Sequence, residues 1–490
     1  MEALQRPHFA KHERSYFLCA NEGILVTPIH EYKSIEKEVQ SLLKKKKELL
    51  LEKILGGTER RIDASCMSCS GTQKTERVFL LRHIAKRAKP QDCFTLTTSF
   101  QNSSSLLLTK ETVVFLESIA VSDRLLFVFL AKTKVVVGEG VSVFSHSEEE
   151  NDIKEYTTEE DKTGSLVRHG PEDAREESLF LENIERIPPN SIDCVCNVVS
   201  LVDSFFVNIL PKMKIHKENE IETFVLGAGW KKGLFDALKT KNEVIDVGKV
   251  LNMRLYQHAI NILPFLKIHE ENEAASVVLA AYWEGDIAKI LEEEKRSVRI
   301  GKTKTLRILS YAVNVLPVLR IDRESSMDLF ELEAYWEGDV AKALEEHNGS
   351  IWVGRIKEMR LHSYAISILL KLRIHGDNEM ERLVLAAYRR SLLFSIPKDG
   401  SFYVGRVKNI SVFGYAIAAF PLLRMHEKNK MECFELRSMG IYTVSEILRN
   451  NNIRLKIGDV GCVSLDTQDM EGSARLEYTL VGGEERVSFE

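Results

Sequence analysis

The chain has 490 residues, of which 44% are hydrophobic and 28% charged, the balance of an ordinary soluble globular protein. This length is too great for one hydrophobic core and predicts two or three units. A formal net charge of −5 and eight dispersed cysteines argue against a strongly basic nucleic-acid binder and against a small disulfide-stapled domain.

The N-terminus shows no apolar stretch preceded by a basic start, so the sequence predicts no secretory signal. The most apolar later run, 125–130, is followed by Lys132 and Lys134 and is far shorter than the ~20 residues that span a bilayer. We therefore expect no membrane span and a cytoplasmic location, with the nucleus as the alternative.

Residues 1–144 form the predicted N-terminal region, and a helix over 33–55 is its clearest element. The helix carries apolar residues at helical spacing, which also makes it a coiled-coil candidate: Ile35, Val39, Leu42, Leu43, Leu49, Leu50 and Ile54. Farther along, a basic helix-like piece at 76–89 and strand-like runs at 112–116 and 134–137 predict a small α/β cap domain.

Residues 145–180 are strongly acidic and contain few apolar positions, with carboxylates clustered at 148–150, 159–161 and 172–173. A segment of this composition has little apolar surface to bury and so little to offset the entropy of becoming ordered. We predict an acidic linker or exposed loop between the N-terminal region and the rest of the chain.

An internal repeat of about 53 residues extends from 190 to 480. The first marker is the pair Leu-Pro or its degenerate form, which starts at Leu210, Leu263, Leu316, Leu369 and Phe420. The second is an aliphatic residue followed by glycine, at Gly248, Gly301, Gly354, Gly405 and Gly458. The third is Leu-x-Ile-His or a variant, which ends at His216, His269, Asp322, His375 and His426. Three markers with one period predict a duplicated structural unit.

Each unit splits into two half-units that share an apolar-x-apolar triplet. The triplets begin at Phe224, Met253, Val277, Leu306, Phe330, Met359, Leu383, Ile410 and Phe434. The half-units alternate between 24 and 29 residues, as from Met253 to Val277 and from Val277 to Leu306. A triplet with period two is typical of a short strand, and such strands bury their apolar side only when copies stack. The pattern predicts a parallel sheet.

The connections between these strands predict helices on the other side of the sheet. Gly285–Glu294 has an acidic start and apolar residues at helical spacing, and Gly338–Glu346 repeats this amphipathic pattern. The alternate connection, 259–266, contains a proline and predicts a short or kinked helix.

The last residues, 474–490, alternate apolar and polar positions on both sides of Gly482-Gly483. This alternation around a glycine pair is typical of a hairpin. Because a terminal repeat must cover its open edge, we predict a C-terminal cap there.

The pattern Leu-x-x-Leu-x-Leu-x-x-Asn-x-Leu defines leucine-rich repeats, and the half-units are similar to it at the apolar positions over roughly 195–480. The chain therefore resembles the leucine-rich-repeat superfamily. The resemblance implies an α/β horseshoe solenoid with a parallel sheet and with helices on the convex side, preceded by the smaller α/β region. A superhelix of helix pairs is the alternative, which β-type triplets fit badly.

One departure from the family pattern is systematic, because tyrosine replaces the usual Asn or Cys. The series comprises Tyr282, Tyr311, Tyr335, Tyr364, Tyr388 and Tyr415, with His258 in the same register. We interpret it as a structural ladder whose hydroxyls bond backbone groups at the strand ends, rather than as a binding stripe.

The resemblance also implies that a partner binds on the concave sheet, through residues between and just after each apolar pair. This mapping selects Arg254, Tyr256, Arg307, Leu309, Glu331, Glu333, Arg360, His362, Phe413, Glu435 and Arg437. Arg, Tyr and Phe are common interface anchors, and the mixed charge favours a protein partner over nucleic acid. The competing interpretation is that these are solvated residues that keep the sheet soluble.

No motif predicts a catalytic centre, a metal site or a cofactor. Equivalent histidines of the third marker would lie two strands apart, roughly 10 Å, which is too far for shared zinc ligation. The run after Gly301 lacks the earlier glycine of a phosphate-binding loop, because Arg296 occupies that position. Cys66 and Cys69 form a lone pair without a second pair at metal-site spacing, and Lys44–Lys47 fits a solvated helix face better than a nuclear-import element.

These observations predict a non-catalytic scaffold that binds a macromolecular partner. One alternative is a leucine-rich-repeat substrate-recognition subunit whose N-terminal region has enzymatic or adaptor activity, which an intact metal site at Cys66 and Cys69 would favour. A structural or host-interacting surface protein is the other alternative, which secretion would favour. Function taken from fold alone is an analogy, and the sequence names neither partner nor oligomeric state.

Overall fold

The computed structural model is a mixed α/β structure with a large parallel sheet. It describes residues 9–20, 23–55, 69–146, 151–156, 165–169, 174–194, 196–202, 205–215, 220–228, 244–269, 271–322, 324–391, 400–437, 455–465 and 476–481. The chain divides into a first unit, Met1–His216 with Gly233–Asn242, and a second unit, Lys217–Lys232 with Glu243–Glu490. Among the described residues, no helix is both long and apolar enough to cross a membrane.

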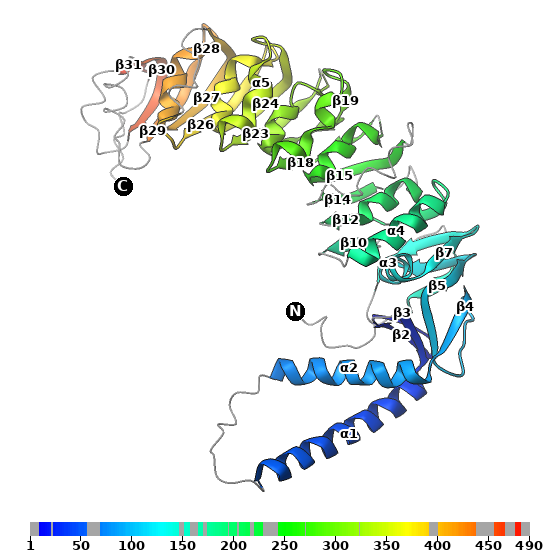
Figure 1. Ribbon diagram of the computed structural model, residues 1–490. Helices are drawn as coiled ribbons and strands as arrows, with labels where there is room; N and C mark the ends of the chain where they lie inside the picture. Colours follow the sequence, from blue (N-terminus) through cyan, green and yellow to red (C-terminus); the bar gives the residue numbers. More distant parts are fainter. Residues whose placement is uncertain are drawn as a thin grey trace. The chain divides into compact units, whose positions relative to one another are not determined.

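The first unit begins with a sheet in the order β1-β2-β3-β5-β4, with β7 also paired to β5. Its strands are β1 (Ala10–His12), β2 (Ser15–Ala20), β3 (Gly23–Pro28), β4 (Lys89–Leu96), β5 (Leu106–Leu116) and β7 (Lys134–Val137). Two long helices, α1 (Ile29–Leu55) and α2 (Cys69–Arg87), pack together and against β2 and β3 (Figure 1). The core joins Ile35 and Val39 of α1 to Ile84 of α2. Coiled-coil pairing of α1 stays a prediction.

A second sheet of the first unit has the order β13-β11-β8-β6-β9. The strands are β6 (Ile119–Ser122), β8 (Val141–Phe144), β9 (Ile153–Glu155), β11 (Ile192–Cys194) and β13 (Met213–Ile215). The unit also contains α3 (Asp123–Lys132), β10 (Ser165–His169), α4 (Ala174–Arg186), β12 (Val198–Val202) and the 3-10 helix η3 (Phe205–Lys212). Phe127 of α3 and Phe180 of α4 both stack edge-on against Phe206 of η3, with ring centroids 4.6 and 4.5 Å apart.

The predicted acidic linker at 145–180 is wrong for its described parts, because β9, β10 and the start of α4 lie within it. Phe180 and Ile184 are fully buried, whereas Glu182 and Glu185 on the same helix are exposed. Buried Asn183 donates to two carbonyls near the end of α3. On α4 the carboxylates of Glu182 and Glu185 lie on the solvent face of an amphipathic helix, whereas the acidic clusters at 148–150, 159–161 and 172–173 lie outside the described residues.

The second unit carries parallel strands in the order β14-β15-β18-β21-β23-β24-β26-β27-β29-β30-β31. They are β14 (Glu220–Ala228), β15 (Ile245–Gln257), β18 (Ser276–Ala281), β21 (Thr305–Ser310), β23 (Ser326–Ala334), β24 (Ile351–Ser363), β26 (Glu379–Ala387), β27 (Phe402–Gly414), β29 (Lys430–Arg437), β30 (Leu455–Leu465) and β31 (Leu476–Leu480). Short outer strands are β16 (Leu266–Ile268), β17 (Glu273–Ala274), β19 (Val298–Arg299), β20 (Lys302–Thr303), β22 (Leu319–Arg320), β25 (Leu372–Ile374) and β28 (Leu423–Met425).

The predicted strand register is confirmed along this sheet. Met253 pairs with Val277, and Val277 pairs with Leu306, as the triplet alignment requires. The same alignment continues without a slip from Leu306 through Phe330 to the last triplet at Phe434. The two apolar residues of every triplet are buried, since their side chains face the apolar side of the sheet.

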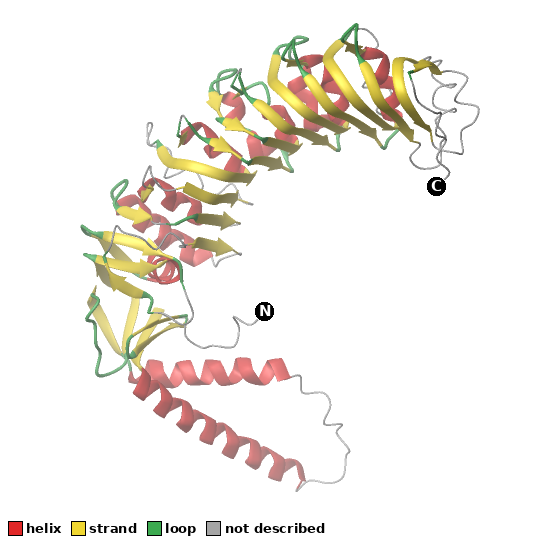
Figure 2. Cartoon of the chain, turned by 180° about the vertical axis from the view of Figure 1, so that it is seen from behind, coloured by secondary structure: helices red, strands yellow, loops and turns green. Residues whose placement is uncertain are grey.

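The connections lie along one side of the strands in Figure 2, and most are 3-10 helices. They are η4 (His258–Phe265), η5 (Glu284–Ile287), η6 (Ile290–Glu292), η7 (Tyr311–Val315), η8 (Glu337–Val340), η9 (Tyr364–Lys371) and η10 (Tyr415–Leu422), with one short α-helix, α5 (Ala341–Leu344). The short helix predicted at 259–266 is η4. The amphipathic α-helix predicted at Gly285–Glu294 is instead the pair η5 and η6.

Buried asparagines explain this replacement. The Asn261 side-chain oxygen accepts from the backbone N–H groups of Lys289 and Ile290, at 3.1 and 2.9 Å. In a continuous α-helix those N–H groups would bond to carbonyls one turn earlier. Asn314 repeats the arrangement one unit later by accepting from Lys342. The asparagine side chain of the preceding 3-10 helix therefore replaces the carbonyl acceptors of a continuous α-helix, so the connection forms short helices instead.

The aliphatic-glycine marker corresponds to a bulge in the long strands. The register shifts between Trp352 and Gly354 and between Tyr403 and Gly405. All five marker glycines have positive φ, from 62° to 84°, a region that disfavours other residues. A Cβ atom at Gly405 would lie only 2.3 Å from the carbonyl oxygen of Asn378.

The first half of the predicted C-terminal hairpin contains a strand. Residues 476–480 form β31, which pairs in parallel with β30. The second half of the predicted hairpin lies outside the described residues. The alternating pattern therefore identified a strand, and its partner among the described residues is β30.

Candidate functional site

The exposed side of the second unit's sheet carries two neighbouring rows of side chains, named here the sheet rows. Row one runs Val225, Arg254, Val278, Arg307, Glu331, Arg360, Val384, Ser411, Glu435 and Ser464. Row two runs Gly227, Tyr256, Ala280, Leu309, Glu333, His362, Ala386, Phe413 and Arg437. All eleven residues predicted from the sequence lie in these rows, on strands that are ~4.8 Å apart.

The centre of the sheet rows is an ion-pair network around Glu331. Its carboxylate is 8% exposed and lies 2.6 Å from Nε of Arg307 and 3.7 Å from Nε2 of His362. Burial lowers the pKa of His362 from its ordinary value near 6.5, although Glu331 and Glu333 act in the opposite direction. His362 is therefore mainly neutral at pH 7, and Arg307 is the main counter-charge of Glu331.

A second network lies farther along the same rows. Buried Ser411 donates to Glu435 at 2.8 Å, and Arg437 lies 2.7 Å from the same carboxylate. Arg382, which lies two residues before Val384 of row one, donates to Oγ of Ser411 at 3.3 Å. Ion pairs within the sheet therefore neutralise part of the charge on the sheet rows. This is expected if these residues are solvated side chains that keep the sheet soluble, which is the competing interpretation given above.

Large aromatic side chains are exposed just after the ends of β18, β23 and β26, and we name this group the aromatic edge. It comprises Tyr282, Trp283, Tyr335, Trp336 and Tyr388, which are 56%, 71%, 47%, 58% and 49% exposed. Each member directly follows β18, β23 or β26 within one or two residues of the strand end. The sheet rows are therefore bordered by the exposed aromatic side chains of the aromatic edge.

The tyrosine series is not one structural ladder, because it alternates between two environments. Tyr364 and Tyr415 are buried, and the Tyr364 hydroxyl lies 2.9 Å from Oγ of Ser391. Tyr282, Tyr335 and Tyr388, from the intervening strands, are exposed. The predicted ladder is therefore wrong for the exposed half. A sequence signal for the exposed tyrosines is an adjacent tryptophan, which follows Tyr282 and Tyr335.

Buried aspartates hold the aromatic edge in place. One oxygen of Asp286 accepts from the backbone N–H groups of Tyr282 and Trp283, both at 3.0 Å. Asp339 does the same for Tyr335 and Trp336, at 2.8 and 3.0 Å. These bonds fix the backbone that presents each aromatic pair, so its exposure does not depend on side-chain contacts with the core.

Neighbouring charges also orient the exposed rings. The Tyr335 hydroxyl donates to Glu333 of row two, and this hydrogen bond raises the pKa of Tyr335 to about 12. The Arg389 guanidinium lies 4.3 Å from the ring centroid of Trp336, within cation–π range. The aromatic edge and the sheet rows are therefore in direct contact through Glu333.

The repeated histidines have a structural role in their turns. Nδ1 of His269, His375 and His426 accepts from the N–H two residues later, at 3.2, 3.2 and 3.1 Å. Asp322 accepts the equivalent N–H at 3.1 Å, which explains how an aspartate can replace a histidine in this series. No cluster of three or more metal-ligand side chains occurs in the described ranges.

Two cysteines have thiols whose pKa is raised above the ordinary value. Burial raises the pKa of Cys433 to about 11, and the pKa of Cys196 is raised by its neighbour Cys194 and by burial. A raised pKa disfavours the reactive thiolate. Cys66 lies outside the described residues.

No protein-family model matches the chain, and no curated protein or solved structure is significantly similar to it. The resemblance to leucine-rich repeats therefore depends on the repeat pattern itself. Function has to be argued from the surface.

Proposed function

We propose that the second unit is a solenoid of the leucine-rich-repeat type, which acts as a non-catalytic scaffold and binds a protein partner on its sheet rows and aromatic edge. The continuous parallel register and the helices along one side of the strands support this class. Packed helices need about 8–10 Å each, whereas strands need ~4.8 Å, so such a stack curves with the sheet on the concave side.

The observation that carries the proposal is the exposure of Trp283 and Trp336 beside the sheet rows. Tryptophan, tyrosine and arginine are the residues most enriched among interface hot spots. Contiguous exposed apolar patches are uncommon on monomeric proteins and mark interaction sites. Here the backbone beneath each tryptophan is fixed by a buried aspartate, so the ring is presented before a partner arrives.

The charge on the rows defines the partner's chemistry. Arg254 and Arg307 are exposed on row one, and Arg389 stands over the aromatic edge. A partner surface with carboxylates opposite these guanidinium groups and apolar side chains opposite the tryptophans would complement both features. A surface that combines carboxylates with apolar side chains is typical of a protein, so we expect the partner to be a protein.

The test is affinity capture with the full-length chain, wild type against Trp283→Ser/Trp336→Ser, from lysate of cells that produce the protein. The control is Val244→Ser, because Val244 is 57% exposed and lies outside the rows and the edge. A hot-spot loss of at least ~2 kcal/mol for each tryptophan, about 4 kcal/mol for both, predicts a partner that wild type and control retain and that the double variant binds several hundred-fold more weakly. Equal retention by all three, with unchanged circular dichroism, would contradict the proposal.

A further inference from the structure

The aromatic edge repeats at every second strand of the sheet. Tyr282, Tyr335 and Tyr388 follow β18, β23 and β26, and these parallel strands end on the same edge of the sheet (Figure 2). The intervening strands β21 and β24 are followed by Tyr311, which is half-buried, and by Tyr364, which is buried. Exposed rings therefore recur two strands apart, which is roughly 9.6 Å for strands that are ~4.8 Å apart.

The exposed tyrosines are close enough to influence one another. The hydrogen bond to Glu333 is the main cause that raises the pKa of Tyr335, and the electrostatic effects of Tyr388 and Tyr282 add to it. Buried aspartates fix the backbone beneath the first two Tyr-Trp pairs. The aromatic edge is therefore one continuous surface whose spacing is set by the sheet.

Exposed carboxylates recur with the rings. Glu284 and Glu337 directly follow the two Tyr-Trp pairs, and both side chains are exposed. Neither carboxylate has a hydrogen-bond or ion-pair partner among the described residues. The sequence Tyr-Trp-Glu thus occurs at 282–284 and again at 335–337, two strands away. A complementary ligand would present an apolar group and a positive charge at the same interval.

A polyproline II helix has a matching repeat. It has three residues per turn and rises about 3.1 Å per residue, so equivalent side chains recur every ~9.3 Å. An extended strand repeats its side chains every ~6.7 Å, and an α-helix advances ~5.4 Å in one turn or ~10.8 Å in two. Of these conformations, polyproline II comes closest to the spacing of roughly 9.6 Å between the aromatic pairs.

The side chains of the aromatic edge also suit this conformation chemically. A polyproline II helix has no internal hydrogen bonds, so its carbonyl oxygens can accept from indole N–H and phenolic O–H groups. Proline-rich segments dock on aromatic surfaces because their conformation is preformed. Trp283 and Trp336 are 71% and 58% exposed on a backbone that is already fixed. Neither side would therefore lose much conformational freedom on binding.

The third repeat of the edge changes its charge. Arg389 stands at the position of the tryptophans, and Arg390 stands at the position of the glutamates. The Arg389 guanidinium lies 4.3 Å from the ring centroid of Trp336. These positive charges repel a basic ligand residue, so they limit the basic part of a ligand to the first two repeats and favour one orientation.

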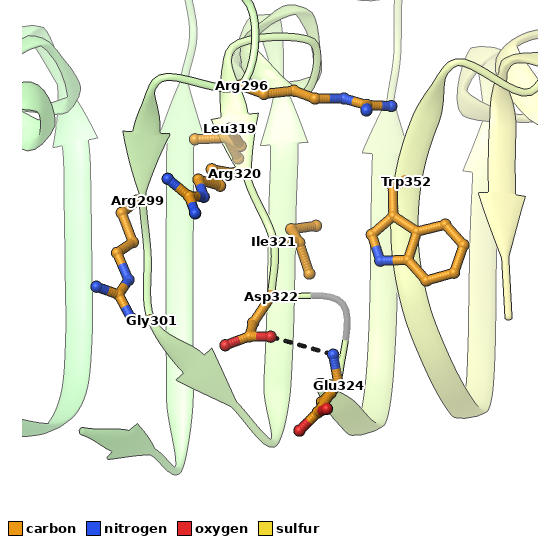
Figure 3. A pocket seen from close by; sticks show the side chains of 9 residues that line it. All are labelled: Arg296, Arg299, Gly301, Leu319, Arg320, Ile321, Asp322, Glu324 and Trp352. Carbon is orange, nitrogen blue, oxygen red and sulfur yellow. Dashed lines mark hydrogen bonds between the residues drawn. The ribbon is translucent and has the colours of Figure 1, made fainter. Parts of the chain in front are cut away.

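A cavity of about 520 Å³ beside β19 and β22 has a different chemistry (Figure 3). Arg296, Arg299 and Arg320 lie around it, and Arg296 donates to the carbonyl of Ser350. Guanidinium groups repel the lysine or arginine side chains that the edge glutamates would attract. A basic proline-rich segment is therefore expected at the aromatic edge and not in this cavity.

We propose that the aromatic edge binds a proline-rich segment in the polyproline II conformation, with prolines against Trp283 and Trp336. Lysine or arginine side chains of the segment lie opposite Glu284 and Glu337. The segment crosses the strand ends, and one turn of it connects one aromatic pair to the next. Since this segment belongs to the protein partner, its assignment rests on the proposed function.

Fluorescence anisotropy of labelled peptides with the full-length chain tests this assignment. The first peptide consists of four Pro-Pro-Lys triplets, which place one lysine in every turn of a polyproline II helix. The second consists of four Gly-Ser-Lys triplets. It has the same charge and the same lysine spacing along the sequence, but it is a flexible coil.

Two double variants remove the two proposed contacts separately. Trp283→Ser/Trp336→Ser removes the aromatic surface, and Glu284→Gln/Glu337→Gln removes the carboxylates while keeping the shape of the side chains. All four positions are exposed, so both variants should fold, and circular dichroism checks this.

Matched controls make the same kinds of change away from the aromatic edge. Glu293→Gln/Glu294→Gln changes the net charge equally at two exposed glutamates of a connection, and Val244→Ser removes an exposed apolar side chain. We expect wild type and both controls to bind the Pro-Pro-Lys peptide at least about 10-fold more tightly than the Gly-Ser-Lys peptide. The tryptophan variant should bind it at least about 10-fold more weakly than wild type, and the glutamate variant about 3-fold more weakly.

Equal binding of the two peptides by wild type, or Pro-Pro-Lys binding that is unchanged in the tryptophan variant, would overturn the assignment. The lysate capture described above separates this failure from that of the proposed function. A captured partner that the tryptophan variant loses, together with no peptide binding, rejects the polyproline II segment and retains the protein-binding function. No captured partner and no peptide binding would reject both.

Discussion

Alanine substitutions at three marker glycines provide a graded test of the repeat geometry. Gly301, Gly354 and Gly405 have similar φ values, 72°, 84° and 74°, so each alanine incurs a similar strain of about 1–2 kcal/mol. The added Cβ would meet different surroundings. Its nearest backbone oxygen is 3.7 Å away at Gly301, 2.8 Å at Gly354 and 2.3 Å at Gly405.

The closest contact cannot relax easily. The carbonyl of Asn378, which the Gly405 Cβ would meet, accepts the N–H of Arg406 at 2.9 Å, and the buried Asn378 side chain bonds Ile356. Overpacking of this kind adds about 1–3 kcal/mol. We therefore expect the free energy of unfolding to fall by about 1–2 kcal/mol for Gly301→Ala and by about 2–5 kcal/mol for Gly405→Ala, with Gly354→Ala between them.

The assay is urea unfolding followed by far-UV circular dichroism, with midpoint and slope compared across the series. The order of the three losses is more informative than any single value, since the strain contribution is shared. Equal losses at all three positions, or the largest loss at Gly301, would refute the close approach of neighbouring repeats at the bulge.

Three further predictions follow from the same structure. Asn261→Ala should lower the free energy of unfolding by about 2–5 kcal/mol, because it removes the acceptor of the buried Ile290 N–H and of the part-buried Lys289 N–H. Ser367→Ala, which removes one bond to Tyr364, should lower it by about 1 kcal/mol, and urea unfolding compares the two variants. Arg296→Gly should raise thermal stability by up to about 1 kcal/mol, and a lowered melting temperature would contradict the assigned left-handed φ. Burial lowers the pKa of His362 in the folded protein, so as pH falls below 6.5 the imidazole is protonated in the unfolded chain before it is protonated in the folded one. The free energy of unfolding should therefore decline as pH falls below 6.5, and this decline should be smaller in His362→Asn. An NMR titration that places the pKa of His362 above 6.5 would contradict this prediction.

The strand register could be predicted from the sequence because period-two burial leaves little freedom. A one-residue slip at Leu306 would expose every apolar side chain of that strand, so the triplets fix the alignment. The same alignment placed all eleven candidate residues in two rows, without any knowledge of the connections. The prediction succeeded where a local pattern determines which side of the sheet a residue faces.

Two features could not be predicted because they depend on contacts between distant residues. The 3-10 connections arise from Asn261 and Asn314, whose partners lie 24–29 residues away. The exposure of Tyr282 and Tyr335, against the burial of Tyr364, depends on which half-unit carries the residue. In both cases the residue type is visible in the sequence, but its environment is set by the neighbouring repeat.

Site-specific photo-crosslinking tests the central claim, that the exposed sheet face binds a protein partner. A photoreactive phenylalanine analogue would replace Leu309 of row two, and in a separate protein it would replace Lys342, an exposed residue of α5. The account predicts a defined crosslinked protein from position 309 and none from position 342, with the product lost in Trp283→Ser/Trp336→Ser. Crosslinks only from position 342, or from neither position under conditions in which a partner is captured, would contradict it.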